Sequence, residues 1–148
     1  MENKYSKYTD DILIQMMENG LDLDENMFEV LTELGIRKHP KTKDYCIRSL
    51  YRDLGYDEYF VSSAFSTLYS IDENEAILFA KNNYEKFHGN ALKTLLSELW
   101  IDSKIYKENP KKVELVKLLK QYLVTLPKEQ IIGIQDDYSE FMNAYKNI

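Results

Sequence analysis

Apolar residues recur three and four positions apart along almost the whole chain, which is the spacing of one face of an α-helix. The periodic stretches begin or end at residues that commonly bound helices, such as Gly20, Gly55 and Pro110. The pattern predicts seven to nine short helices, with candidates at residues 10–19, 24–34, 43–54, 57–69, 73–88, 90–106, 110–123 and 137–145. The stretch 57–69 also suits a strand, because it is rich in aromatic and β-branched residues, but helix is favoured.

Three helix ends carry specific expectations. Gly35 is expected to take the left-handed conformation that closes the helix at 24–34. Asp72 and Glu75 have the spacing of a capping box at the start of the helix that follows them. Asp136 or Asp137 is expected to cap the last helix.

The predicted connections are short, so consecutive helices should be antiparallel neighbours. Two all-α architectures fit this pattern, a compact array or a short HEAT-like solenoid of helix pairs. One internal echo favours stacking, since Val30–Ile36 resembles Leu50–Tyr56, and Leu95–Ile101 resembles both without the glycine. Because offsets of 20 and 45 residues are not a fixed period, both architectures remain open.

Length and composition are those of a globular protein. The chain has 148 residues and is 44% hydrophobic, which is enough for a core without metal or disulfide, and we expect one helical domain over residues 1–148. Cys46 is the only cysteine, so an internal disulfide is excluded. Met1–Asp11 alternates charged and polar residues, and no run approaches the roughly 18 apolar residues of a membrane span. A soluble, cytoplasmic protein is expected.

The sequence is short of catalytic parts. His39 and His88 share no predicted helix, so no zinc site is expected from them. Cys46 lies on the apolar side of its helix, where cysteine usually acts as a small hydrophobic residue. The two glycine-rich phosphate-binding motifs, GxGxxG and GxxxxGK followed by Ser or Thr, do not occur. We therefore expect no catalytic residue, no metal and no cofactor.

Acidic residues are concentrated near the beginning of the chain. Residues 1–36 hold nine acids and two lysines. On the helix expected at 24–34, Glu25, Glu29 and Glu33 fall within an arc of about 80°, with Asp22 near it. Like charges at this spacing cost about 0.2–0.5 kcal/mol each. The stripe is either a solvated face or a surface that a cationic partner covers.

Basic residues follow immediately, with six bases and two acids in residues 37–56. Arg48 and Arg52 share a helix face with Tyr45, a combination that suits a protein-binding hot spot or stacking on nucleic-acid bases. The alternative is pairing with acidic helices of the same chain. A pI near 5.0 argues against nucleic acid as the partner. A later group is expected to form a solvated helix face: Lys111, Lys112, Lys117, Lys120 and Lys128.

The acidic helix at residues 22–33 and the Tyr-, Lys-, Asn- and Ile-rich composition make the chain similar to bacterial immunity proteins. These proteins neutralise toxins of contact-dependent inhibition and related polymorphic toxin systems. The resemblance is one of type over the whole chain and includes no diagnostic motif. It implies a non-catalytic protein that binds a cationic toxin domain, commonly a nuclease, through an acidic surface.

Two other functions remain open. A helical regulatory or adaptor protein of phage or bacterial origin would use the aromatic-rich region 45–69 as its contact surface. A metal-dependent hydrolase is the weaker alternative, since Asp22 and Glu25 alone have a suitable spacing. The expected partner is a cationic protein rather than a membrane or nucleic acid, and the oligomeric state is open. The residues expected to bind it are Asp22, Glu25, Glu29, Glu33, Tyr45, Arg48 and Arg52.

Overall fold

The computed structural model describes residues 3–20, 27–103 and 109–148. The described residues form nine α-helices and one short 3-10 helix, and they contain no strand, which confirms the all-α class. The helices are α1 (Asp10–Gly20), α2 (Met27–Ile36), α3 (Thr42–Asp53), α4 (Glu58–Ile71), α5 (Glu73–Asn83), η1 (Tyr84–Lys86), α6 (Gly89–Asp102), α7 (Pro110–Leu123), α8 (Lys128–Ile132) and α9 (Gln135–Ala144).

Polar side chains cap the first residues of several of these helices. The Asp57 carboxylate accepts hydrogen bonds from the backbone N–H groups of Tyr59 and Phe60, which begins α4 as a helix rather than a strand. The Asp72 side chain accepts from the backbone N–H of Glu75 at the start of α5. The other half of the expected capping box does not form, because the backbone N–H of Asp72 bonds to the carbonyl of Leu68 at the end of α4.

Two of the expected helix ends are wrong. Gly35 lies inside α2 and is buried, and Lys38 takes the left-handed conformation instead, with φ of 54°. Gly35 serves helix packing, because a Cβ atom there would lie 2.6 Å from Cγ2 of Thr67 in α4. Neither Asp136 nor Asp137 caps α9, because both lie within its first turn and Ile134 precedes them.

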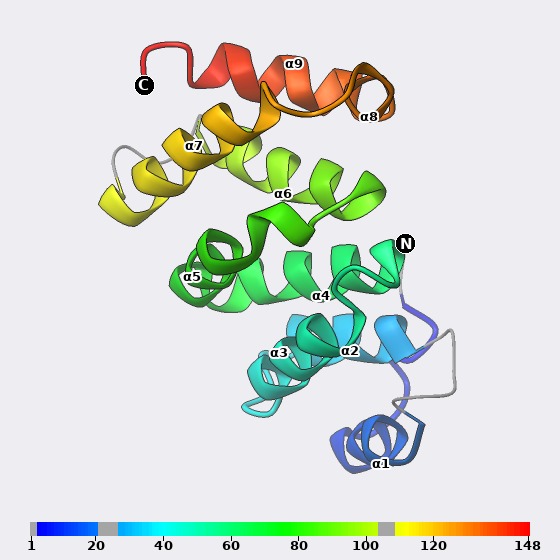
Figure 1. The fold of residues 1–148 in the computed structure, drawn as a ribbon. Helices are drawn as coiled ribbons and strands as arrows, with labels where there is room; N and C mark the ends of the chain where they lie inside the picture. Colours follow the sequence, from blue (N-terminus) through cyan, green and yellow to red (C-terminus); the bar gives the residue numbers. More distant parts are fainter. Residues whose placement is uncertain (1–2, 21–26, 104–108) are drawn as a thin grey trace.

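The helices stack from α1 at one end to α9 at the other (Figure 1). In what we call layer A, α2 packs against α4, α4 against α6, and α6 against α9. In layer B, formed by α3, α5 and α7, the rings of Tyr51 and Phe79 meet edge to face between α3 and α5, and α5 packs against α7. The compact array is thus built from helix pairs, with α4 against members of both layers.

A regular spacing underlies the middle of the stack. Thirty-one residues separate the first residues of α4 and α6, the last residues of α4 and α6, and the first residues of α3 and α5. The echo seen in the sequence does not mark this period, because its copies fall at the ends of α2 and α3 and within α6. The echo is therefore a shared type of helix segment and not a repeat unit.

The core runs through the whole stack between the layers. Its largest fully buried side chains include Tyr45, Phe65, Phe87 and Phe141. In the described part of the chain, none of the helices has the length and hydropathy needed to cross a membrane.

Candidate interaction surface

Layer A and layer B differ in their charged residues. The helices α2, α4 and α6 contain two, one and three charged side chains in 38 residues, whereas α3, α5 and α7 contain five, three and five in 37. Of the six in these layer A helices, only Lys93 is exposed, since Glu33 and Asp102 are buried and the other three are half-buried. The surfaces of α2, α4 and α6 therefore carry few charges, although 30% of all residues are charged. The last helix of layer A, α9, differs from them and exposes Asp136 and Glu140.

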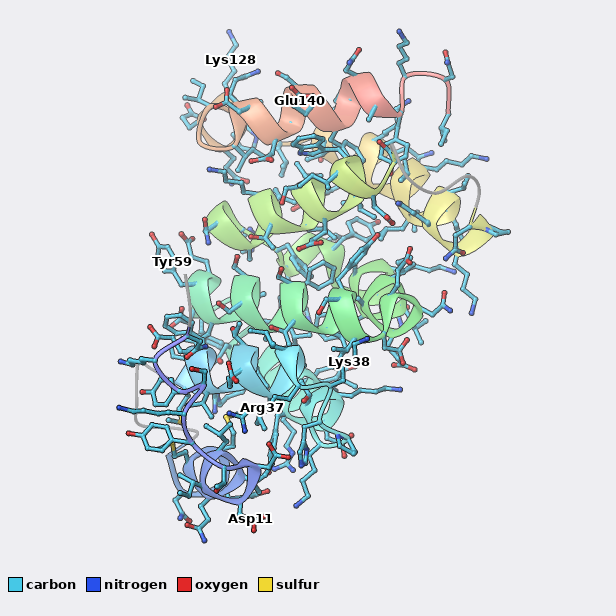
Figure 2. The ribbon with its side chains drawn as sticks, turned by 180° about the vertical axis from the view of Figure 1, so that it is seen from behind. Asp11, Arg37, Lys38, Tyr59, Lys128 and Glu140 are labelled. Carbon is cyan, nitrogen blue, oxygen red and sulfur yellow. The ribbon has the colours of Figure 1, made fainter. Side chains whose placement is uncertain are left out.

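Hydroxyl and apolar side chains occupy the outward stripes of these helices instead. We define the outer face of layer A by its exposed or half-buried members Phe28, Thr32, Ile36, Tyr59, Ser63, Ser70, Ser97 and Ile101. Ile36, Tyr59 and Ile101 are 67%, 69% and 51% exposed. Figure 2 looks onto this side of the molecule, with Tyr59 at the start of α4. Depletion of charge beside exposed aromatic residues is typical of the centre of a protein interface.

The helices α4 and α6 meet along a row that we call the hydroxyl seam, made of Ser62, Ser66, Thr94 and Glu98. The hydroxyls of Ser62 and Thr94 are hydrogen-bonded, and Ser66 Oγ donates to Glu98 Oε1 over 2.6 Å. Each pair is 32 residues apart, so α4 and α6 lie parallel and in register. All four side chains are half-buried. Burial raises the pKa of Glu98, and the hydrogen bond from Ser66 opposes this in part.

The same contact between α4 and α6 ends in a buried ionic group. Lys112 Nζ and Tyr69 Oη both bond to Oδ2 of Asp102, at 2.6 Å and 2.8 Å. Burial disfavours the Asp102 carboxylate, but the hydrogen bonds from Lys112 and Tyr69 outweigh it and lower the pKa of Asp102. Glu73 Oε1 lies 3.4 Å from Tyr69 Oη, and burial together with the Asp102 charge raises the pKa of Glu73. This group joins α4, α5, α6 and α7.

The acidic stripe expected on α2 is largely used inside the protein. Glu33 is only 5% exposed and binds Arg37, with 2.9 Å between Oε1 and Nε. Glu29 is half-buried and forms an ion pair with Lys4 at 3.5 Å. Asp22 and Glu25 lie outside the described residues. The expectation of an open acidic surface is therefore wrong at Glu33, because the fold supplies Arg37 as its partner.

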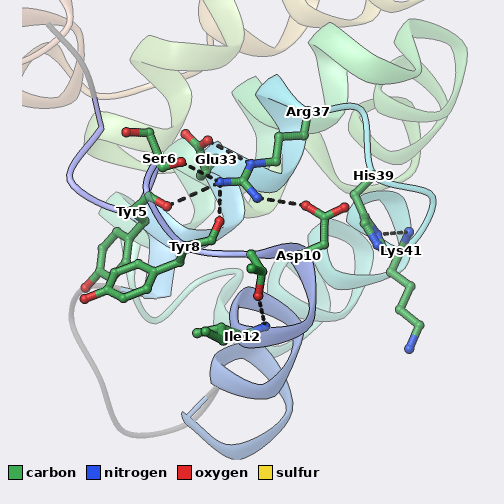
Figure 3. Close-up of polar contacts among 10 residues, drawn as sticks. Tyr5, Ser6, Tyr8, Asp10, Ile12, Glu33, Arg37, His39 and Lys41 are labelled. Carbon is green, nitrogen blue, oxygen red and sulfur yellow. Dashed lines mark hydrogen bonds and ion pairs between the residues drawn. The ribbon is translucent and has the colours of Figure 1, made fainter.

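Arg37 also fastens the segment before α1 to the end of α2 (Figure 3). Its Nη1 binds Oδ1 of Asp10 at 2.8 Å, and its Nη2 donates to the carbonyls of Tyr5, Ser6 and Tyr8. The guanidinium has five N–H donors in a fixed fork, which suits this set of acceptors. Arg37 thus belongs to the interior contacts of the acidic part of the chain and not to a basic surface.

The basic patch expected at Tyr45, Arg48 and Arg52 is also changed by the fold. Tyr45 is fully buried, and its hydroxyl donates to Glu18 Oε1 at 2.5 Å. Burial and this hydrogen bond raise the pKa of Tyr45 to about 12. Arg48 is exposed and lies 5.1 Å from the centre of the Tyr45 ring, while Arg52 binds Asp53 at 2.8 Å. The expectation that Tyr45 is an exposed contact residue is wrong.

Other side chains of the aromatic-rich region 45–69 are open to solvent. Tyr51, Tyr56 and Tyr59 are 67%, 91% and 69% exposed, whereas Phe65 is fully buried. Tyr59 belongs to the outer face of layer A, and Tyr51 lies in layer B against Phe79. Tyr51 and Tyr59 therefore lie in different layers, so the exposed tyrosines of the region 45–69 are not all on one face.

Reactive groups in the described residues are few. Cys46 is fully buried, and burial raises the pKa of its thiol to about 12, so it is a poor nucleophile at neutral pH. Within residues 3–20, 27–103 and 109–148, no three side chains of the metal-binding types come together in a way that could hold an ion.

Sequence reasoning missed both the hydroxyl seam and the buried ionic group. A signal for the seam exists, because α4 carries no charged residue after Glu58 and has serines or threonines at successive turns. The sequence gives no sign that Lys112 is buried, since it is one of five lysines that were all expected to form a solvated helix face. It is instead 5% exposed, which corrects that expectation.

The chain was compared with protein families, curated proteins and solved structures, and no significant match was found in any of the three.

Proposed function

We propose that this chain is a non-catalytic protein-binding protein of the immunity type, which binds a cognate toxin domain and blocks it. The single observation that carries the proposal is the outer face of layer A, where exposed apolar and hydroxyl side chains extend over α2, α4 and α6, and Lys93 is the one exposed charged side chain of these three helices. A rigid stack of helix pairs offers such a face as one extended surface, which is how helical repeat proteins bind their partners.

The composition of this face supports a protein partner. Exposed Ile36, Tyr59 and Ile101 would each bury apolar area on binding, which is the main favourable contribution in most protein association. The surrounding serines and threonines can form hydrogen bonds without the desolvation cost of unpaired charges. The proposed contact surface is therefore the outer face of layer A, and not the acidic stripe of α2 that the sequence suggested.

The partner is proposed to be a cationic protein, a toxin domain of nuclease type. A regulatory or adaptor protein would use the same kind of surface, and exposed Tyr51 and Tyr56 are the observation that favours it. A metal-dependent hydrolase gains nothing from the described residues, because Asp22 and Glu25 lie outside them.

The test uses a pair of matched variants of the whole chain. Ser63→Arg places a charge in the centre of the outer face of layer A, and Asn82→Arg places the same charge on exposed α5 in layer B. Partners are captured from the source cells at low and at moderate salt, identified, purified and titrated against the parent and both variants. We expect one basic protein to bind the parent and Asn82→Arg at one to one, and Ser63→Arg to bind at least tenfold more weakly.

Two results would count against the proposal. Equal affinity of Ser63→Arg and the parent would remove this face as the contact surface. If no protein is retained at either salt concentration, the binding function itself is unsupported, and screens for enzymatic activity become the next step.

A further inference from the structure

Glu98 stands out in the hydroxyl seam because it is the one carboxylate in a row whose other members are hydroxyl side chains. Ser62 and Ser66 lie across the seam on α4, Thr94 lies one turn earlier on α6, and all three are uncharged. Ser66 Oγ donates to Oε1 over 2.6 Å, and no side chain among the described residues donates to Oε2. The carboxylate is thus half-buried with one neutral hydrogen bond.

No cation in the described part of the chain pairs with Glu98. Lys112 binds the neighbouring carboxylate of Asp102 and is 7% exposed at its side chain. Lys93 lies five residues before Glu98 on α6, which places it about 140° away around the helix. The nearby charge of Asp102 adds negative potential at Glu98 and raises its pKa further beyond the effect of burial.

A half-buried carboxylate without a cation is energetically unfavourable, and an opposite charge that reaches it in a sheltered site gains more than it would in open water. The guanidinium group suits the site best, because it is planar, weakly hydrated and able to bond a carboxylate and neighbouring hydroxyls at once. Ser97 and Ile101, which belong to the outer face of layer A, lie on α6 with Glu98. A partner that covers this face would therefore come close to the Glu98 carboxylate.

We propose that Glu98 is the anchor point of this surface and receives an arginine side chain of the protein partner at the hydroxyl seam. The inference rests on the proposed function and names the partner chemistry: one arginine inserted into an otherwise uncharged contact. The positive charge of the partner would then pair with Glu98. It would not pair with the acidic stripe of α2, because Glu33 in that stripe is already paired with Arg37.

The experiment does not need the natural partner. The whole chain, labelled with ¹³C at the glutamate carboxyl carbons, is titrated with Nα-acetyl-arginine amide and, separately, with Nα-acetyl-citrulline amide. Citrulline has the same shape without the charge, so it isolates the guanidinium. The Glu98 signal is assigned by its loss in Glu98→Gln, and Glu140, exposed on α9, serves as the internal control (Figure 2).

We expect the Glu98 signal to move in a saturable way with the arginine probe at millimolar concentration, at least threefold further than Glu140, and to stay in place with citrulline. A Glu98 shift that is linear and no larger than that of Glu140, or that is equal for both probes, overturns the proposal. The proposed function and the Glu98 anchor can fail separately. If a captured partner binds Glu98→Gln as tightly as the parent, the role of Glu98 as the anchor is wrong and the binding function stands. If the arginine probe binds saturably but no partner is captured from cells, the proposed function is unsupported and the Glu98 site stands.

Discussion

Lys112 in α7 places its Nζ 2.6 Å from Oδ2 of Asp102 at the end of α6, and the two side chains are only 7% and 12% exposed. Removing one member of a buried ion pair leaves the other charge without compensation, which costs about 3–5 kcal/mol. We therefore expect Lys112→Met to lower the free energy of unfolding by about that amount, measured by urea denaturation with helical circular dichroism.

Lys117 on the same helix provides the matched control, because it is exposed. Lys117→Met should change the free energy of unfolding by no more than about 0.5 kcal/mol. The double variant Lys112→Met with Asp102→Asn should lose less than the sum of the two single variants, by about 0.5–3 kcal/mol. If the single losses simply add, the two side chains do not interact as the distance implies.

The pH dependence of stability should have opposite signs at Glu73 and Asp102. Glu73 faces Tyr69 of α4, Asp102 of α6 and Lys112 of α7, and burial with the Asp102 charge raises its pKa above the ordinary 4.5. The folded protein therefore favours the protonated form of Glu73. This contribution to the free energy of unfolding is fully present below about pH 4.5 and is lost as the pH rises through the folded pKa of Glu73. Glu73→Gln, which stays neutral, should be more stable than the parent near neutral pH and similar to it in acid.

The lowered pKa of Asp102 predicts the reverse. Its contribution is present above the ordinary value of 3.8 and is lost as the pH falls through the folded pKa. Asp102→Asn should therefore be less stable than the parent near neutral pH, with the deficit shrinking in acid. Urea denaturation from about pH 2 to about pH 7 measures both variants, because the Asp102 contribution is lost below its ordinary pKa. Parallel pH profiles for the two variants and the parent would contradict the assignment.

Gly35 and Thr67 test the packing of α2 against α4. A Cβ atom at Gly35 would lie 2.6 Å from Thr67 Cγ2, and Thr67 is 8% exposed, so neither helix can yield without disturbing the core. We expect Gly35→Ala to lower the free energy of unfolding by about 1–3 kcal/mol, although alanine favours helix. Thr67→Ser in the same chain removes Cγ2 and should restore most of the loss. A stabilising Gly35→Ala would show that the contact is loose.

Local chemistry explains which features could be predicted from the sequence. The caps at Asp57 and Asp72 and the helix start at Pro110 depend on residues adjacent in the chain. The start at Pro110 and the Asp72 half of the capping box form as expected. Gly35 was misjudged because glycine is required equally by a left-handed helix end and by a close helix crossing, and only the position of Thr67 separates the two.

The candidate surface was harder to predict because charge partners come from distant parts of the chain. Glu33 and Tyr45 have the sequence pattern of exposed residues, and they are removed from the surface by Arg37 and by the packing that brings Glu18 to the Tyr45 hydroxyl. Glu98 resembles any surface glutamate until α4 lies beside α6 and surrounds it with hydroxyls. The all-α class could be predicted without knowing these contacts, because the spacing of apolar residues along the chain is enough to indicate helices.

Lys38 closes α2 in a conformation that costs a residue with a side chain about 1–2 kcal/mol and costs glycine little. Its N–H bonds to the carbonyl of Gly35, and the N–H of His39 bonds to that of Leu34, both at 3.0 Å, so this helix end is a regular one with the wrong residue type. Lys38→Gly should raise the free energy of unfolding by about 0.5–1 kcal/mol, after allowance for the greater freedom of glycine in the unfolded chain. Lys38→Ala is the control, because it removes the charge and keeps the strain, and it should bring no gain. If alanine stabilises the protein as much as glycine does, the lysine charge and not the backbone is the cause.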